Sequence, residues 1–186
     1  MKVDGRRVRG EESSRALVDA TLRILERDGV GGISYRAVAR EAQTSANAVA
    51  YHFGSIDALL LESIRSATAT WAEAIEALRP AHFAADLAGL LVKEAANNRR
   101  RLVAEFELYL LAGRKPALRQ AARAWADSLL VPLQDLSEIE RRRLIAVIDG
   151  LYVQLLLADD SVAGDVLAGI IDSALPDRYK AGADRK

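Results

Sequence analysis

Hydrophobic positions recur every three or four residues along nearly the whole chain, as they do in amphipathic helices. No window alternates apolar and polar residues convincingly enough to indicate a strand. A clear helical stripe lies early in the chain and consists of Leu17, Ala20, Thr21, Ile24 and Leu25. The pattern therefore predicts an all-α protein.

Turn and capping residues divide this pattern into nine expected helices. Gly29 suits the C-terminal end of the first helix, and Ser137 with Glu140 three residues later forms a capping box. The first expected helix begins near Glu11 or Glu12 and ends before Gly29. The next seven span 35–42, 44–53, 55–78, 83–96, 101–112, 116–130 and 137–158. Ser161 caps the last helix, and Pro176 ends it.

The second and third of these helices are short and follow one another closely. Ser34 suits the N-cap of the first, and a break at Gln43 and Thr44 separates them. Either Thr44 or Ser45 can cap the second. Val49 and Phe53 lie four residues apart and share the inner face of the third helix. The residues left on its outer face are mostly small and are Ala46, Asn47, Ala50 and Tyr51. This arrangement describes a helix-turn-helix.

Several motifs in the first 60 residues resemble those of the tetracycline-repressor (TetR) family of regulators. They are Arg15-Ala16-Leu17 through Gly29, the run from Ile33 to Ala42, Thr44-Ser45, and the run Tyr51-His52-Phe53-Gly54-Ser55 with the residues to Leu60. The resemblance implies a three-helix DNA-binding domain followed by a helical domain for ligand binding and dimerisation. Residues 61–186 match the family in helical layout only.

Three positions depart from the family pattern. Gln43 stands in the turn where glycine is common, and a left-handed backbone there would be strained by about 1 kcal/mol. Ala50 replaces an aromatic residue and Ile56 replaces a lysine, both of which contact DNA phosphates in the family.

The chemistry of the helix-turn-helix residues suits contact with both the bases and the backbone of DNA. Arginine can pair with guanine, asparagine can pair with adenine, and alanine methyl groups can meet a thymine methyl. The residues expected to read bases are Arg36, Ala46, Asn47, Ala48 and Ala50. The residues expected to contact phosphates are Ser34, Thr44, Ser45, Tyr51 and His52, with Arg6, Arg7 and Arg9 as a basic arm.

The last two helices are apolar on more than one side, which predicts a core face and a partner face. The family resemblance likewise implies a four-helix dimer interface, and a thick monomer core is the alternative. The expected interface residues are Leu144, Ile148, Leu151, Tyr152, Leu155, Val166 and Ile170. The resemblance also places a small-molecule cavity on the middle helices, where the candidate lining residues are Trp71, Phe106, Tyr109 and Trp125.

Composition narrows the function classes. The 186 residues hold 26 basic and 26 acidic side chains and no cysteine, which excludes disulfides, thiolate nucleophiles and cysteine-based zinc sites. Neither His52 nor His82 has a glutamate three residues before it, so a di-iron carboxylate enzyme is disfavoured. We expect no enzyme activity, no metal and no cofactor. No segment approaches the length of a membrane span or a secretory signal, so we expect a soluble cytoplasmic protein.

These observations predict a DNA-binding domain over residues 1–56, with residues 1–10 as a flexible basic arm, and a regulatory and dimerisation domain over residues 57–186. Residues 1–56 hold nine basic and seven acidic side chains, so the small positive excess lies at the proposed DNA end. The expected function is that of a homodimeric repressor that a small apolar or aromatic ligand releases from a near-palindromic operator. The alternative is a helical dimeric interaction module with weakened or lost DNA binding.

Overall fold

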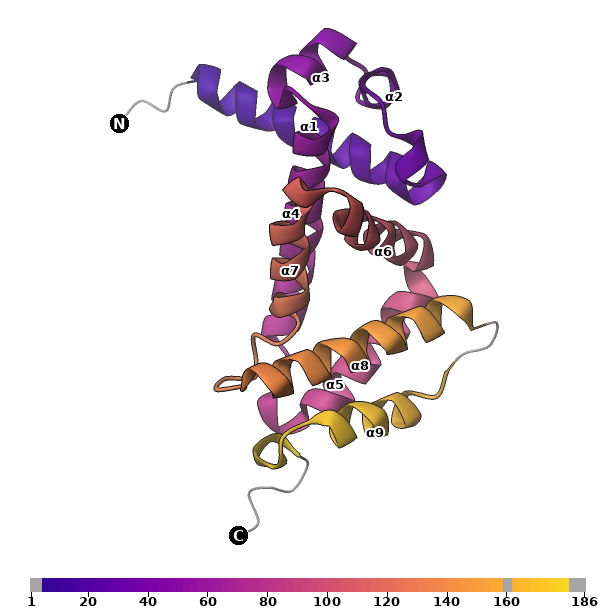
Figure 1. Cartoon of the computed structure of the whole chain (residues 1–186). Helices are drawn as coiled ribbons and strands as arrows, with labels where there is room; N and C mark the ends of the chain where they lie inside the picture. The colour runs from indigo at the N-terminus through magenta and orange to yellow at the C-terminus, as the bar shows by residue number, and fades with distance from the viewer. Residues whose placement is uncertain (1–4, 159–161, 181–186) are drawn as a thin grey trace. The chain divides into compact units, whose positions relative to one another are not determined.

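The computed structural model describes residues 5–158 and 162–180, and within them the chain is helical with no strand (Figure 1). The α-helices are α1 (Gly5–Asp28), α2 (Tyr35–Glu41), α3 (Ala46–Phe53), α4 (Ile56–Glu76), α5 (Phe83–Asn97), α6 (Arg99–Arg114), α7 (Arg119–Ser128), α8 (Glu138–Leu157) and α9 (Gly164–Ala174). Short 3₁₀ turns are η1 (Val30–Gly32), η2 (Pro80–His82), η3 (Pro116–Leu118) and η4 (Asp177–Tyr179). The all-α prediction is confirmed. No helix of the described part combines the length and the apolar character that crossing a membrane requires.

The chain divides into two compact units, and the first contains the helix-turn-helix. It comprises residues 1–67 together with 103–122, so that α6 and η3 pack with α1–α3 and the beginning of α4. The packing units thus differ from the predicted division between residues 56 and 57, because α6 returns to the N-terminal helices. The division into a DNA-binding and a regulatory domain stays a prediction.

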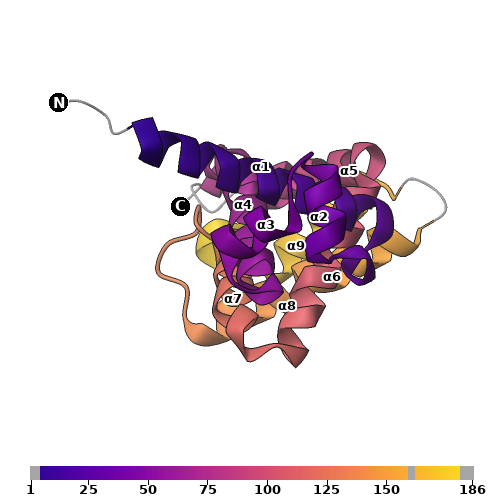
Figure 2. The same cartoon turned by 90° about the horizontal axis from the view of Figure 1, so that it is seen from above.

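The first unit is built on the buried face of α1. The predicted stripe is confirmed, because none of its five side chains is more than 3% exposed. They are Leu17, Ala20, Thr21, Ile24 and Leu25. Thr21 satisfies its hydroxyl inside the helix by donating to the Leu17 carbonyl at 2.8 Å. Both views show α2 and α3 side by side against this helix (Figures 1 and 2).

The start of α1 differs from the sequence-based expectation. The helix begins at Gly5 rather than near Glu11 or Glu12, so residues 5–10, which were expected to form a flexible arm, continue the helix. Arginine is a good helix former, and these residues extend an existing helix without the cost of starting a new one. Residues 1–4 lie outside the described part.

The second unit comprises residues 68–102 and 123–186, and α5 lies at its centre against α8 and α9. Each of these helices buries one apolar face. On α5 the buried residues are Phe83, Ala84, Leu87, Ala88 and Leu91, and on α9 they are Leu167, Ile171 and Ala174. Because three helices converge, their inward faces form one core that excludes water.

Proline residues decide how α7 begins and ends. Pro116 was expected to open an α-helix, but it opens the 3₁₀ turn η3, and α7 begins only at Arg119. The helix ends at Ser128, two residues before the predicted Leu130, and the N–H groups of Leu129, Leu130 and Val131 donate to carbonyls three residues earlier. Pro132 has no N–H with which to continue the helix, and its ring would collide with the Ser128 carbonyl.

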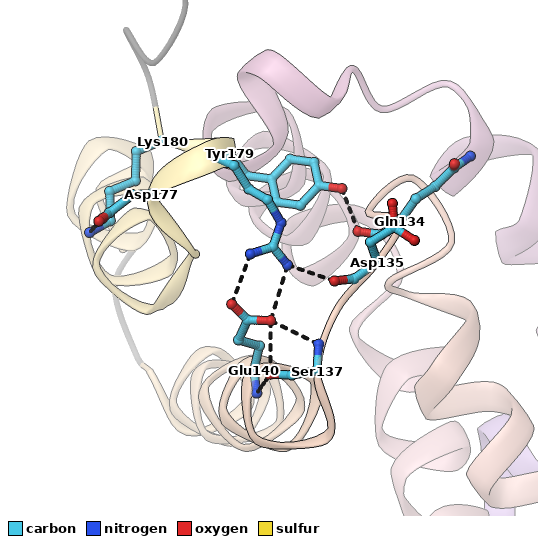
Figure 3. Close-up of polar contacts among 8 residues, drawn as sticks. Gln134, Asp135, Ser137, Glu140, Asp177, Tyr179 and Lys180 are labelled. Carbon is cyan, nitrogen blue, oxygen red and sulfur yellow. Dashed lines mark hydrogen bonds and ion pairs between the residues drawn. The ribbon is translucent and has the colours of Figure 1, made fainter.

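Residues near the C-terminus clamp the beginning of α8. Ser137 and Glu140 form the predicted capping box, with the Ser137 backbone N–H donating to Glu140 Oε2 at 2.8 Å. Arg178 donates to both Glu140 carboxylate oxygens at 2.9 and 3.0 Å and to the Asp135 carbonyl at 2.8 Å. The Tyr179 hydroxyl donates to the Gln134 carbonyl (Figure 3). Ala163 occupies the N-cap position of α9 without a side-chain capping hydrogen bond, and the predicted cap Ser161 lies outside the described residues.

The Arg178 clamp makes the stability of the second unit depend on pH. Hydrogen bonds from Arg178, and then from Ser137, lower the pKa of Glu140 from 4.5 to about 2. A carboxyl group whose pKa is lowered by folding stabilises the fold above its unfolded pKa and loses that effect as pH falls through the folded value. Glu140→Gln keeps a capping-box acceptor but removes the charge, so we expect a lower melting temperature at pH 7 and a difference from the parent that shrinks between pH 4.5 and pH 2.

The control for this comparison is Glu138→Gln, which breaks only the exposed pair with Arg142 inside α8. Exposed pairs of this kind contribute little, so its melting temperature should stay close to that of the parent. Thermal unfolding followed by circular dichroism at several pH values measures both variants. An equal, pH-independent shift in the two variants would contradict the role given to Arg178.

Candidate nucleic-acid interface

Serine side chains fix the starts of both helices of the helix-turn-helix. Ser34 accepts a hydrogen bond from the Ala37 backbone N–H at 3.1 Å, as the sequence predicts. Ser45 accepts from the Ala48 N–H at 3.1 Å and is therefore the cap of α3, which the sequence left open between Thr44 and Ser45. These caps set the points at which the two helices begin.

The turn between α2 and α3 is strained at Gln43. Its φ of 53° is left-handed, as the departure from the family's glycine suggested. The next residue, Thr44, donates its backbone N–H to the Ala39 carbonyl at 2.8 Å, which closes the end of α2. The turn thus keeps the usual closing hydrogen bond at a backbone cost of about 1 kcal/mol.

The inner faces of α2 and α3 pack on α1. Val38 and Val49 have no exposed surface, and Phe53 packs partly buried against the same apolar cluster. Ile33, before the cap of α2, packs partly buried against this cluster too. The predicted inner face is confirmed, and the opposite face of α3 is left toward solvent.

The structure places most of the predicted DNA-contacting residues on that open side. Tyr51 is 87% exposed and its ring meets the His52 ring edge-on at 5.6 Å. The exposed members of the predicted set are Arg36, Ser34, Thr44, Ser45, Asn47 and Tyr51, and the half-buried members are Ala46, Ala48, Ala50 and His52. Arg6, Arg7 and Arg9 belong to the first turns of α1, and their side chains lie outside what the structure describes.

The start of α4 explains one departure from the family pattern. Ser55 caps the helix by accepting from the Ala58 N–H at 3.0 Å. Ile56 packs partly buried against the second apolar cluster, which contains Leu60 and Leu108. An isoleucine here therefore contributes to packing at the position where a lysine would contact DNA. Beside it, Asp57 forms an ion pair with Lys115.

An ion-pair network that the sequence did not reveal holds α2 against α1. Glu41, the last residue of α2, accepts from Arg23 Nε at 2.9 Å and from Arg27 Nη1 at 3.1 Å. These hydrogen bonds, first that of Arg23, lower the pKa of the Glu41 carboxyl group. Arg23 and Arg27 lie four residues apart on α1, which is the only sequence signal of a shared partner.

The predicted pocket residues fall into two pairs. Trp71 and Trp125 are buried in the second unit, and each meets the Tyr152 ring edge-on, at 6.2 and 6.4 Å. Phe106 and Tyr109 belong to the first unit, where their rings lie 5.8 Å apart. A cleft of about 610 Å³ in the first unit is lined by none of these four residues. No group of acidic or histidine side chains suited to a metal ion occurs in the described residues.

The residues predicted for the dimer interface are mostly buried inside the chain. Five of them, Leu144, Ile148, Leu151, Tyr152 and Leu155, are at most 6% exposed, so they form the core face of α8 and leave no surface for a partner. Val166 and Ile170, on α9, are 55% and 39% exposed. The exposed large apolar residues of α8 are Ile139, Val153 and Leu157.

Two family models match the chain. Residues 17–63 match the model described as bacterial regulatory proteins of the tetR family, and residues 78–177 match the tetracyclin repressor-like C-terminal domain. The first covers α2 and α3 with the second half of α1, and the second covers more than half of the chain, including α5–α9.

Individual proteins agree with these models. The HTH-type transcriptional regulator BetI of Rhizobium meliloti (strain 1021) is 25% identical, over 92% of each chain. A TetR-family member from Streptomyces coelicolor A3, SCO1917, is 32% identical with a TM-score of 0.76, over 89% of this chain and 99% of that one. The multidrug binding protein EbrR complexed with ethidium is 30% identical with a TM-score of 0.79, over 88% and 99%. The chain therefore belongs to the TetR family of transcriptional regulators, which are DNA-binding proteins and not enzymes.

Proposed function

We propose that this protein is a cytoplasmic homodimeric repressor that binds a near-palindromic operator and leaves it when a small apolar or aromatic ligand binds. The observation that carries the proposal is the outer face of α3. Asn47 and Tyr51 are exposed there on a helix whose opposite side is fully buried through Val49. A rigid helix with small side chains on its open face suits the major groove.

Bases are read by a small set of side chains. Asn47 pairs with adenine through its amide, and Arg36, exposed at the beginning of α2, pairs with guanine. Ala46, Ala48 and Ala50 are half-buried and short, so the α3 backbone can approach the base edges closely. Their methyl groups contact the thymine methyl.

Phosphate contacts fix the register of the helix on DNA. Ser34 and Ser45 use a lone pair to cap their helices, and each hydroxyl hydrogen remains available to a phosphate oxygen. Thr44, Tyr51 and His52 add donors around the same face. Arg6, Arg7 and Arg9 are proposed to reach the backbone or the minor groove from the start of α1.

Base-reading and phosphate-contacting residues respond differently to mutation. Asn47→Ala removes a bidentate base contact, so we expect a loss of about 1–3 kcal/mol at the preferred base and a relaxed preference at that position. His52→Ala removes a backbone contact, so it should weaken all sites by a similar factor. Selection of bound fragments from random DNA, followed by affinity measurements at several salt concentrations, distinguishes the two effects.

The two replacements of family phosphate contacts, Ala50 and Ile56, favour the alternative of a helical interaction module without DNA binding. Under that alternative the parent protein recovers no sequence even at low salt, where phosphate contacts are strongest. Lys93→Gln on α5 is a suitable control, because it removes one positive charge from an exposed position outside the helix-turn-helix. Its selected site and affinity should match those of the parent.

The homodimer is supported by the open apolar side of α8 and α9. Val153, Leu157, Val166 and Ile170 are all at least 39% exposed. Gly150 and Gly169 lie within these helices, and a Cβ atom at either position would contact nothing in the chain. Glycine costs about 1 kcal/mol relative to alanine in a helix, and close approach of a second subunit is a physical reason to retain it. Dimerisation would present two α3 helices to half-sites about 34–36 Å apart.

Charging the open face should separate the subunits without unfolding them. The double variant Val166→Lys with Ile170→Lys places two cations on the exposed side of α9, and we expect it to be monomeric. Sedimentation or light scattering should give the subunit mass of 20.2 kDa for the variant and twice that mass for the parent. Val131→Lys changes a 57% exposed residue outside these helices and should stay dimeric. A double variant that keeps the parent's mass would contradict this interface.

The ligand-binding part of the proposal rests on the buried aromatic cluster and on a relative. EbrR has been crystallised with ethidium, malachite green and proflavin, each of which contains several aromatic rings. Here the rings of Trp71 and Trp125 each meet the Tyr152 ring edge-on. The Arg101 guanidinium lies 5.7 Å from the centre of the Trp71 ring. Such aromatic surfaces bind flat apolar molecules by stacking and burial.

Both tryptophans of the chain belong to this cluster, so intrinsic fluorescence reports on it directly. We expect malachite green to change the tryptophan emission in a saturable manner and to lower operator affinity. Trp71→Phe keeps an apolar ring of smaller area and should weaken the binding of the compound by a few-fold, while operator affinity without it is unchanged. Unchanged emission across a panel of such compounds would contradict the proposed ligand class.

A further inference from the structure

A carboxylate on α6 holds the corner through which α1 leads into the helix-turn-helix. Glu107 Oε2 accepts a hydrogen bond from the Val30 backbone N–H at 2.9 Å, from 77 residues along the chain. Val30 opens η1, and N–H groups in the first turn of a helix lack partners within the helix. Gly29, at the cap position, has no side chain to accept this hydrogen bond, so Glu107 supplies the acceptor from α6.

Gly29 leaves the space that this contact requires. Its φ is 68°, and a Cβ atom at this position would lie 2.8 Å from Glu107 Oε2 and 3.2 Å from Oε1. A side chain at Gly29 is therefore disfavoured by the left-handed backbone, and it would also displace the flexible Glu107 carboxylate from its hydrogen bond with Val30. The glycine and the glutamate fit one another as a pair.

Only a short stretch of ordered backbone separates this contact from the proposed DNA-binding face. Within η1, the Gly32 N–H donates to the Gly29 carbonyl at 3.1 Å and the Ile33 N–H donates to the Val30 carbonyl at 3.2 Å. Ser34 then caps α2, and Arg36 follows two residues later. The orientation of η1 thus sets the direction in which α2 begins.

The position of Glu107 is itself fixed by the packing of α6. Ala104, Leu108 and Ala112 are at most 4% exposed in the apolar cluster that includes Leu25 and Leu60. Glu107 lies on the solvent side of the helix, beside Leu110 and Arg114 in the open cleft that Val30 also lines. Its hydrogen bond is therefore anchored on the α6 side by a buried helix face, although the carboxylate itself is exposed.

We propose that Glu107 is a positioning residue for DNA binding, which fixes η1 and thereby the start of α2 without touching DNA. This inference rests on the proposed function, because its consequence is measured as operator affinity. It assigns a role in DNA recognition to a helix outside the helix-turn-helix. It also gives a physical reason for a glycine at position 29, where the chain turns from α1 into η1.

Glu107→Ala removes the acceptor, and we expect operator affinity to fall roughly 2- to 10-fold, the factor that corresponds to one net hydrogen bond. The salt dependence of binding should keep its slope, because no phosphate contact is lost. Glu107→Gln retains an amide oxygen that can accept from Val30 and should restore most of the affinity. Glu73→Ala, the same change at another exposed helical position, should have no effect. Full affinity in Glu107→Ala would overturn the proposal.

Hydrogen exchange separates this proposal from the proposed function. Glu107→Ala should speed exchange of the Val30 amide in the absence of DNA, while amides in the middle of α3 keep their protection. If the parent selects no operator, the proposed function fails, and the Val30 amide still reports whether the contact exists. An unchanged Val30 exchange rate would overturn the contact itself.

A double-mutant cycle gives the sharpest measurement. Gly29→Ala introduces both backbone strain and the collision with Glu107, whereas in a Glu107→Ala background only the strain remains. We therefore expect Gly29→Ala to reduce operator affinity by a larger factor in the parent than in Glu107→Ala. Equal factors in the two backgrounds would show that residues 29 and 107 act independently and would overturn their coupling.

Discussion

Burial of Val49 is the constraint on which the proposed DNA-binding surface depends. Val49 has no exposed surface and packs in one cluster with Val38 of α2 and Ile24 of α1. Fully burying a valine contributes about 1.5–3 kcal/mol, which is enough to fix the rotation of an eight-residue helix. Because side chains around a helix point in fixed relative directions, Asn47 and Tyr51 must then face outward. The functional surface is a geometric consequence of the core.

Features that depend on neighbouring residues could be predicted from the sequence. The nine helices of the described residues and the caps at Ser34 and Ser137 follow from residue types within a few positions of one another. The left-handed turn at Gln43 was suggested only by the resemblance to a family in which glycine is common there. Helix ends were less accurate where competing signals were weak. The start of α1 is an example, since residues 5–10 carry no strong capping residue and the helix continues through them.

Features that join distant segments could not be predicted in this way. Glu41 with Arg23, and Glu107 with Val30, are hydrogen-bonded across 18 and 77 residues. The sequence signals the first pair only through the four-residue spacing of Arg23 and Arg27, and it carries no signal of the second. The two apolar sides of α8 posed a related problem. The pattern correctly indicated that both sides are apolar, yet α5 and α9 bury the side that contains Leu151. Hydrophobic spacing shows that a face is covered and leaves open which segment covers it.

The paired carboxylates change the interpretation of the chain's neutral charge. Acidic residues near a DNA-binding surface oppose phosphate binding when their charge faces the DNA. Here Glu41 is neutralised by Arg23 and Arg27 of α1, and Asp57 is paired with Lys115. A further acid of this unit, Glu107, accepts from the backbone of η1. These acids are used to hold the helices in place. The outer face of α3 has no acidic side chain between Ala46 and Tyr51, so it does not repel DNA even though the domain has little net charge. Affinity for such a surface must come largely from specific contacts, because a nearly neutral domain gains little from nonspecific attraction to DNA.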